Sequence, residues 1–161
     1  MIQSVNPAPT DETDGLPMPK RIWAVISVGF ALCMSVLDVN IINIVLPTLS
    51  HDFGTSPAVT TWIINGYQLA IVVSLLSFSA LGEIIGYRKV YLSGIGLFCI
   101  TSLICALSAS FWTLTIARIF QGFSASAITS VNTAQLRYIY PKSQLGRGMG
   151  INAMVVALSL I

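Results

Sequence analysis

Two ionisable side chains stand inside long apolar stretches of this sequence, and they are its best candidates for chemistry. Asp38 lies within residues 22–46 and Arg118 within residues 111–134, two stretches that are otherwise free of Asp, Glu, Lys and Arg. A charge at the centre of an apolar membrane helix costs about 2.5–3.5 kcal/mol, so such residues usually face a cavity or each other. Their types therefore indicate proton exchange or binding of a charged ligand. The alternative is a buried ion pair that only fixes helix register.

The amino-acid composition indicates whether the protein is surrounded by water or by lipid. Of the 161 residues, 55% are hydrophobic and only 9% are charged, whereas an ordinary soluble domain carries roughly 25% charged residues. So few charges cannot cover the surface of a soluble protein, which excludes a soluble enzyme. The net charge of +2, without a basic stripe, argues against a nucleic-acid partner. The expected surroundings are a lipid bilayer.

Four apolar stretches are long enough to cross a bilayer, which takes about 20 helical residues. They cover about residues 22–46, 59–81, 90–109 and 111–134, and a fifth begins near Met149 and is cut off by the end of the sequence. These runs lack the alternation of barrel strands. The sequence therefore predicts an all-α integral membrane protein, with four complete spans and a truncated fifth in residues 21–161.

The basic residues predict how the spans are oriented. Seven of the eight fall on one side, before the first span, between spans two and three, or between spans four and five. They are Lys20, Arg21, Arg88, Lys89, Arg137, Lys142 and Arg147. The positive-inside rule then makes the N-terminus cytoplasmic. Residues 1–20, rich in proline and acidic side chains, are predicted to be a disordered cytoplasmic tail.

The two charges are predicted to lie at similar depth. Asp38 is about 13 Å from the outer end of its span and Arg118 about 10 Å from the outer end of its own, at 1.5 Å per residue. A direct or water-bridged pair between them is therefore possible. We hypothesise that gain or loss of a proton at Asp38 switches this interaction.

Other polar residues in the spans support a cavity around the pair. The alternative for each is an ordinary hydrogen bond between helices. The polar candidates are Asn40, Asn43, Tyr67, Gln68 and Gln121. Gly122, Ser126 and Ser130 recur at four-residue spacing, which favours close helix packing. Cys33, Cys99 and Cys105 lie in spans without metal-site spacing and are interpreted as packing residues.

Two motifs resemble a known family. Residues 37–47 are similar to the first-helix signature of the fourteen-helix drug:proton antiporters in the major facilitator superfamily, with Asn40 where Thr is common. Residues 114–123 resemble the fourth-helix motif L-x-x-x-R-x-x-Q-G and retain all its fixed positions, including Gln121 and Gly122. The resemblance implies that Asp38 takes part in proton coupling or in recognition of a cationic substrate, and that Arg118 takes part in proton transfer.

A third and looser match covers the turn between spans two and three. Residues 82–89 resemble the loop motif G-x-L-A-D-R-x-G-R-K, with Glu83 in place of Asp and with Gly86, Arg88 and Lys89 retained or equivalent. The resemblance implies a conformational latch between two halves of a transporter. Gly86 permits a tight turn, and Glu83 is expected to pair with Arg88 or with a helix end from the other half. The alternative is that this is a charged turn between two helices, whose basic residues only keep it on the cytoplasmic side of the membrane.

The resemblance implies part of the N-terminal six-helix bundle of a major facilitator fold in the bacterial cytoplasmic membrane. The implied function is proton-coupled efflux of small lipophilic or cationic compounds, with protons as coupling ion and no cofactor, metal or enzymatic step. The expected partners are the bilayer, these compounds and the missing C-terminal helices of the same protein. The alternatives are another carrier of the superfamily, for a nutrient or metabolite, and a tetraspan scaffold protein.

Overall fold

The computed structural model describes residues 15–159, which fold as a helical bundle without a strand. The elements are α1 (Met18–Asp52), α2 (Pro57–Thr60), α3 (Trp62–Ile85), α4 (Tyr87–Ala106), α5 (Phe111–Ile139), the short 3₁₀ helix η1 (Lys142–Gln144) and α6 (Leu145–Ser159). The predicted all-α fold is confirmed. Most of the predicted tail, residues 1–14, lies outside the described residues.

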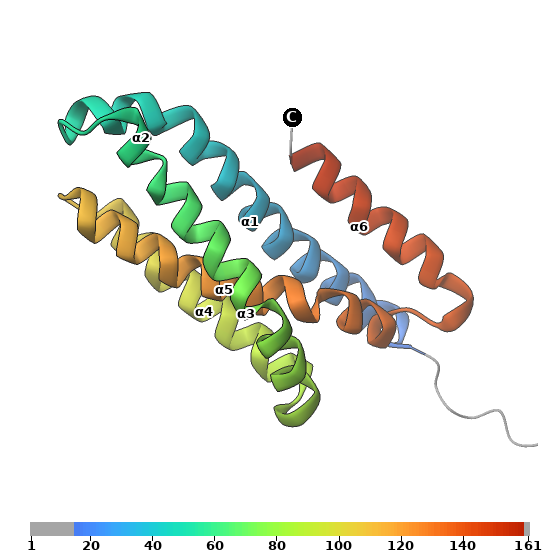
Figure 1. Ribbon diagram of the computed structural model, residues 1–161. Coiled ribbons are helices and arrows are strands. Elements are labelled where there is room, and N and C mark those ends of the chain that lie inside the picture. The colour runs from blue at the N-terminus through green and yellow to red at the C-terminus, as the bar shows by residue number, and fades with distance from the viewer. Residues whose placement is uncertain (1–14, 160–161) are drawn as a thin grey trace, which may run out of the picture.

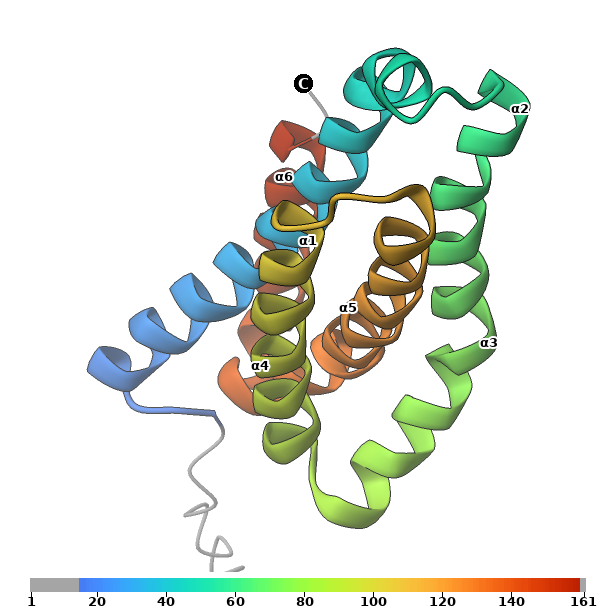
Figure 2. The same ribbon diagram turned by 90° about the vertical axis from the view of Figure 1, so that its left-hand side faces the viewer.

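Consecutive long helices of the bundle are antiparallel (Figure 1). Helix α5 lies at the centre. Helices α3 and α4 make the most extensive contacts with α5, one on each side of it (Figure 2). Helix α1 crosses this group and contacts both α5 and α6. Consequently α5 buries many more residues than any other helix.

Within residues 15–159, three segments are long and apolar enough to cross a membrane: α1, the Pro57–Ile85 segment and α4. Helix α5, the fourth predicted span, is long enough at 29 residues but less apolar. Its buried side carries polar residues, among them Arg118, Gln121 and Asn132. Because α3 and α4 flank it, these side chains are shielded by protein rather than exposed to lipid.

Helix α1 differs from its prediction at both ends. It continues through Pro47 to Asp52 instead of ending near Leu46. A proline inside a helix lacks the N–H that would bond the carbonyl four residues earlier, here that of Asn43, and the helix tolerates this loss. It also starts at Met18, so residues 18–20 are helical rather than part of a disordered tail. With 35 residues, α1 is about 52 Å long and exceeds a hydrocarbon core about 30 Å thick.

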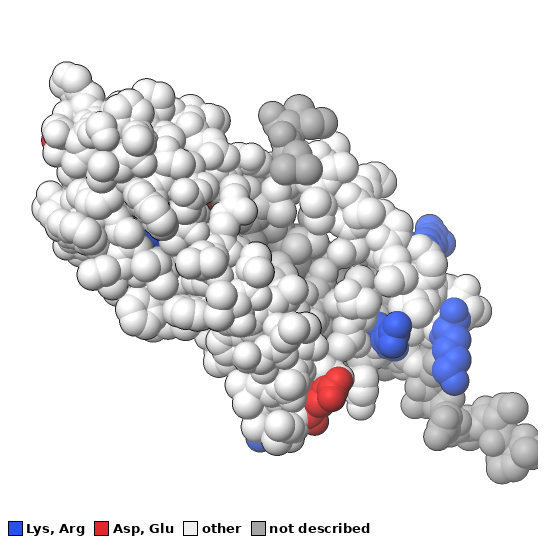
Figure 3. Space-filling model, viewed as in Figure 1, with Lys and Arg blue, Asp and Glu red and all other residues white. Residues whose placement is uncertain are grey.

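Charged side chains gather at one end of the molecule (Figure 3). The alternating helices bring the start of α1, the α3–α4 turn and the α5–α6 connection to this end, and these segments contain the seven basic residues outside the spans. Elsewhere the visible surface is almost free of charge, and large apolar side chains such as Phe30, Leu76 and Ile100 are exposed. This surface suits contact with a lipid bilayer.

Small residues allow α3 and α5 to approach closely. A Cβ atom on Gly122 would lie 2.5 Å from the backbone oxygen of Tyr67 and 2.9 Å from the Cβ of Ala70. One turn later, the Ser126 hydroxyl donates to the Ile71 carbonyl at 3.3 Å. The packing role predicted for Gly122 and Ser126 is confirmed, whereas Ser130 bonds its own helix, at Ala127.

We predict that Gly122→Ala destabilises the bundle, because the added methyl group would collide with the backbone of α3. Such overpacking costs about 1–3 kcal/mol, which should appear as a lower melting temperature of the detergent-purified protein. Gly96→Ala on α4 is the matched control, since a Cβ there meets open space. Equal melting temperatures for the two variants would contradict this packing.

Candidate functional site

The two charges predicted from the sequence meet in the structure. The Arg118 guanidinium donates from Nη1 to Oδ2 of Asp38 at 2.7 Å. The two side chains are only 9% and 15% exposed, respectively. The expected contact between the first and fourth spans is therefore confirmed, as a direct ion pair between α1 and α5.

Gln121 completes the contact with Asp38 from the same helix. It lies three residues after Arg118, so both side chains project from one face of α5. Its Nε2 donates to Oδ1 of Asp38 at 3.1 Å. The α5 helix thus binds both oxygens of the carboxylate, one through a cation and one through a neutral amide.

Cys105 on α4 extends this network. Its thiol donates from Sγ to Oε1 of Gln121 at 3.5 Å. We interpreted the cysteines as packing residues, and for Cys105 this was incomplete. The sequence holds no signal for its contact, because the register of α4 against α5 decides which residue faces Gln121.

The hydrogen-bonding capacity of Arg118 is not fully used. Its Nε is buried and has no partner within the part of the chain that the structure describes. A buried donor without an acceptor costs about 1–3 kcal/mol, more for a charged group. The Nε–H group of Arg118 is therefore able to donate a hydrogen bond to a further or different partner.

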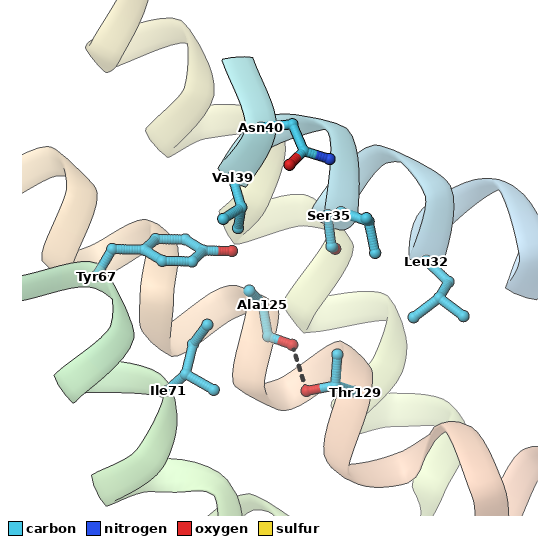
Figure 4. Close-up of a pocket in the computed structure, with 9 residues that line it drawn as sticks. Leu32, Ser35, Val39, Asn40, Tyr67, Ile71, Ala125 and Thr129 are labelled. Carbon is cyan, nitrogen blue, oxygen red and sulfur yellow. Dashed lines mark hydrogen bonds between the residues drawn. The ribbon is translucent and has the colours of Figure 1, made fainter. Parts of the chain in front are cut away.

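A cavity of about 250 Å³ lies between α1, α3 and α5 (Figure 4), and its wall includes Val39, which directly follows Asp38 along α1. Most of its wall is apolar, and the Tyr67 hydroxyl points into it. Tyr67 also interacts electrostatically with both Asp38 and Arg118. The lining residues are Leu32, Ser35, Val36, Val39, Asn40, Tyr67, Ile71, Ala125 and Thr129. A space of this size and polarity suits part of a small lipophilic compound.

The polar cavity candidates separate into three groups. Gln121 is fully buried and contacts Asp38 without lining the cavity. Tyr67 and Asn40 line the cavity, and the Asn40 amide also donates to the Ser159 carbonyl of α6 at 3.0 Å. Asn43 and Gln68 are instead exposed and do not line it. The other residues that line the cavity were not predicted from the sequence, because apolar residues that face a cavity cannot be distinguished there from apolar residues that face lipid. Their only signal is helical spacing along α1, at residues 32, 35, 36 and 39.

The α3–α4 turn consists of Gly86 alone. Its φ of +98° lies in the region that favours glycine, which confirms the expected tight turn. Glu83, Arg88 and Lys89 are exposed at this end. Of the two partners considered for Glu83, Arg88 is wrong, since the side-chain contacts between acidic and basic residues within residues 15–159 are Asp38–Arg118 and His51–Asp52. The residues diverge because the reversal at Gly86 sends the two helices in different directions. A helix end from the other half stays a prediction.

No metal-binding group stands out near this site. Among the described residues there is no cluster of three or more His, Cys, Asp and Glu side chains that would hold an ion. The contacts of Asp38 with Arg118 and Gln121 offer reversible protonation and hydrogen bonding at its carboxylate.

Comparison with known proteins shows which family the chain belongs to. Residues 28–161 match the sequence profile of the Major Facilitator Superfamily. The chain belongs to this superfamily. The match covers all six α-helices apart from the first turns of α1, and it includes both residues of the ion pair. The tetraspan scaffold alternative therefore has no support, since this is a superfamily of multi-pass membrane transporters.

Curated members of the Major Facilitator Superfamily are much longer than this chain. The chain is 50% identical over 151 residues to the Escherichia coli "Uncharacterized transporter YebQ", which covers 94% of the chain and 33% of the relative. It is 30% identical over 140 residues to the Mycobacterium tuberculosis "Drug efflux pump JefA", covering 87% and 28%. It is 32% identical over 151 residues to the "Tetracenomycin C resistance and export protein" of Streptomyces glaucescens, covering 94% and 27%. The chain thus spans about a third of these relatives or less.

We predict that removing only the anion of the pair is strongly destabilising. Because arginine does not lose its proton in proteins, Asp38→Leu leaves an uncompensated buried cation, which costs about 3–5 kcal/mol. The double variant Asp38→Leu/Arg118→Met should recover much of this loss. The measurement is the free energy of unfolding in mixed detergent micelles.

Asp52→Asn is the control for this experiment, because it changes an aspartate of the same helix whose side chain is 63% exposed. It should leave the free energy of unfolding nearly unchanged. If Asp38→Leu behaved like Asp52→Asn, the pair would not be buried as described.

Proposed function

We propose that the transporter to which this chain contributes exports small lipophilic or cationic toxic compounds in exchange for protons. The observation that carries the proposal is the buried Asp38–Arg118 pair, together with a largely apolar cavity whose wall includes Tyr67, a residue that interacts with both members of the pair. Protons are the proposed coupling ion, and no cofactor is involved. The site lies in the bacterial cytoplasmic membrane, with the charged end of the bundle on the cytoplasmic side.

Protonation of Asp38 would change how α1 is held against α5. In the ionised state, the carboxylate binds Arg118 and Gln121 of α5. A neutral carboxyl group loses most of its attraction to the guanidinium, which then lacks a counter-ion. Both helices also form walls of the cavity. A proton at Asp38 would therefore weaken the α1–α5 contact and alter the cavity at the same time.

This coupling is what exchange of substrate for a proton requires. A ligand drives a conformational change only through its different affinity for two states. Here the proton favours the state with the open pair, and a substrate in the cavity favours the other. Arg118 Nε has no hydrogen-bond partner among residues 15–159, which is consistent with a guanidinium that binds other groups in another state.

Two polar residues that are exposed in this structure would contact other parts of the complete transporter. Asn43 and Gln68 are exposed on helices that cross the membrane, where contact with lipid is unfavourable. We assign these faces to a water-filled pathway or to further helices of the same protein, as the longer relatives allow. The 83–89 turn would then act as the latch against those helices.

Two named relatives favour efflux, and a third favours another carrier. The drug efflux pump and the tetracenomycin C resistance and export protein described above support export of toxic compounds. The "Riboflavin transporter RibZ" of Clostridioides difficile is 31% identical over 140 residues, covering 86% of this chain and 31% of the relative. A carrier of a nutrient or metabolite is therefore the second candidate, with the same pair coupling transport to protons.

We predict that cells expressing the complete gene extrude ethidium only while a proton gradient is present. Asp38→Asn should reduce extrusion to the level of cells without the gene, since the variant cannot exchange a proton. Asp52→Asn on the same helix should extrude like the parent. Dye fluorescence during re-energisation measures this, with protein amounts matched by immunoblot.

Two outcomes would decide against efflux. Equal ethidium accumulation with and without the gene, together with proton-driven uptake of riboflavin or a similar metabolite, would support the second candidate. Unimpaired extrusion by Asp38→Asn would contradict the assigned role of the carboxylate in either candidate.

A further inference from the structure

The side-chain amide of Gln121 uses both of its polar ends inside the protein. Its Nε2 donates to Asp38 on α1, and its Oε1 accepts from the Cys105 thiol on α4. The side chain is fully buried, so water does not compete for either end. The orientation of this amide is therefore set by its two protein partners.

The orientation of Gln121 suits an ionised Asp38, because a carboxylate accepts hydrogen bonds and donates none, and Oδ1 here accepts from the Nε2 end of the amide. The Arg118 cation donates to Oδ2, so a proton on the carboxyl group is better placed on Oδ1. There its O–H is a donor that the Oε1 end of a rotated amide would accept. The two protonation states of Asp38 thus favour opposite orientations of Gln121.

The Cys105 thiol favours one of these orientations. An S–H group is a weak donor, and it binds Oε1 as the amide stands. If the amide rotated, the thiol would face the NH₂ end, and the hydrogen bond seen here would be lost. Cys105 therefore stabilises the orientation that matches the carboxylate.

We propose that Gln121 is a positioning residue whose amide orientation follows the protonation of Asp38, and that Cys105 sets the balance between the two orientations. The consequence for transport depends on the proposed function. The hydrogen bonds themselves do not. Through these two hydrogen bonds the protonation state of Asp38 on α1 also affects α4.

The surroundings of Asp38 allow this effect to be isolated. The titratable or charged groups that interact with it are Arg118 on α5, Tyr67 on α3 and Cys105 on α4. Replacing Cys105 by Ala or Ser leaves the first two in place. Ser retains a donor at this position and Ala does not, so the two variants separate hydrogen bonding from the removal of sulfur.

Carbodiimide labelling gives a readout that does not need transport. Dicyclohexylcarbodiimide modifies protonated carboxyl groups in apolar surroundings, and mass spectrometry of the purified complete protein measures modification of Asp38 as a function of pH. In Cys105→Ala the midpoint of this profile should move to higher pH by about 0.5 units, as expected for loss of one modest hydrogen bond. Cys105→Ser should restore the parent midpoint, and Cys99→Ala, at an exposed position of α4, should not change it.

A double substitution tests whether the thiol acts through the amide. Gln121→Leu should shift the midpoint in the same direction, and adding Cys105→Ala should then cause no further shift. An unchanged midpoint in Cys105→Ala, an equal shift in Cys105→Ser, or additive shifts in the double variant would each overturn the proposal. Size-exclusion profiles confirm that every variant is folded.

The two proposals can fail separately. If transport does not depend on protons but the labelling midpoints shift as expected, the antiport function is wrong and the positioning role stands. If dye efflux depends on protons and on Asp38 but Cys105→Ala labels like the parent, the positioning role is wrong and the antiport function stands.

Discussion

The cost of burying charge in an apolar bundle governs this structure. Asp38 and Arg118 are each surrounded in sequence by apolar residues, and neither is stable alone within a bilayer. They are tolerated because they meet at 2.7 Å in the interior. The pairing requires α1 to contact α5 at one register, and it requires α5 to be covered by its neighbours. The central place of α5, and the small residues that let α3 approach it, follow from this requirement.

The same arrangement joins the charge pair to the cavity. Helices α1 and α5 supply both the pair and much of the cavity wall, while α3 adds Tyr67 between them. A change in the contact between Asp38 and α5 is therefore also a change in the space beside it. In the proposed function, this shared construction is what would link a proton at Asp38 to a cargo in the cavity. Gln121 and Cys105 do not line the cavity, but they belong to the hydrogen bonds that hold the Asp38 carboxylate.

The sequence was most informative where a residue conflicted with its surroundings. Asp38 and Arg118 stood out because charge is rare in apolar stretches, and Gly86 because a short reversal favours a residue that adopts positive φ. The contact of Cys105 with Gln121 and the apolar cavity wall were not predictable, since both depend on the register between helices that are far apart in sequence. Helix α1 passed its predicted end because a single proline costs one hydrogen bond, which a long packed helix tolerates. The pairing of Glu83 with Arg88 failed because closeness in sequence does not by itself bring side chains together across a reversal, whereas its pairing with a helix end from the other half stays a prediction.

Proton release on substrate binding tests the central claim most directly. The complete transporter is purified in detergent at low buffer capacity, and a pH indicator records the response when ethidium is added. If substrate and proton exchange at Asp38, the parent protein and Asp52→Asn release protons, and Asp38→Asn releases none. Equal proton release from Asp38→Asn and the parent would contradict the claim that this carboxylate carries the exchanged proton.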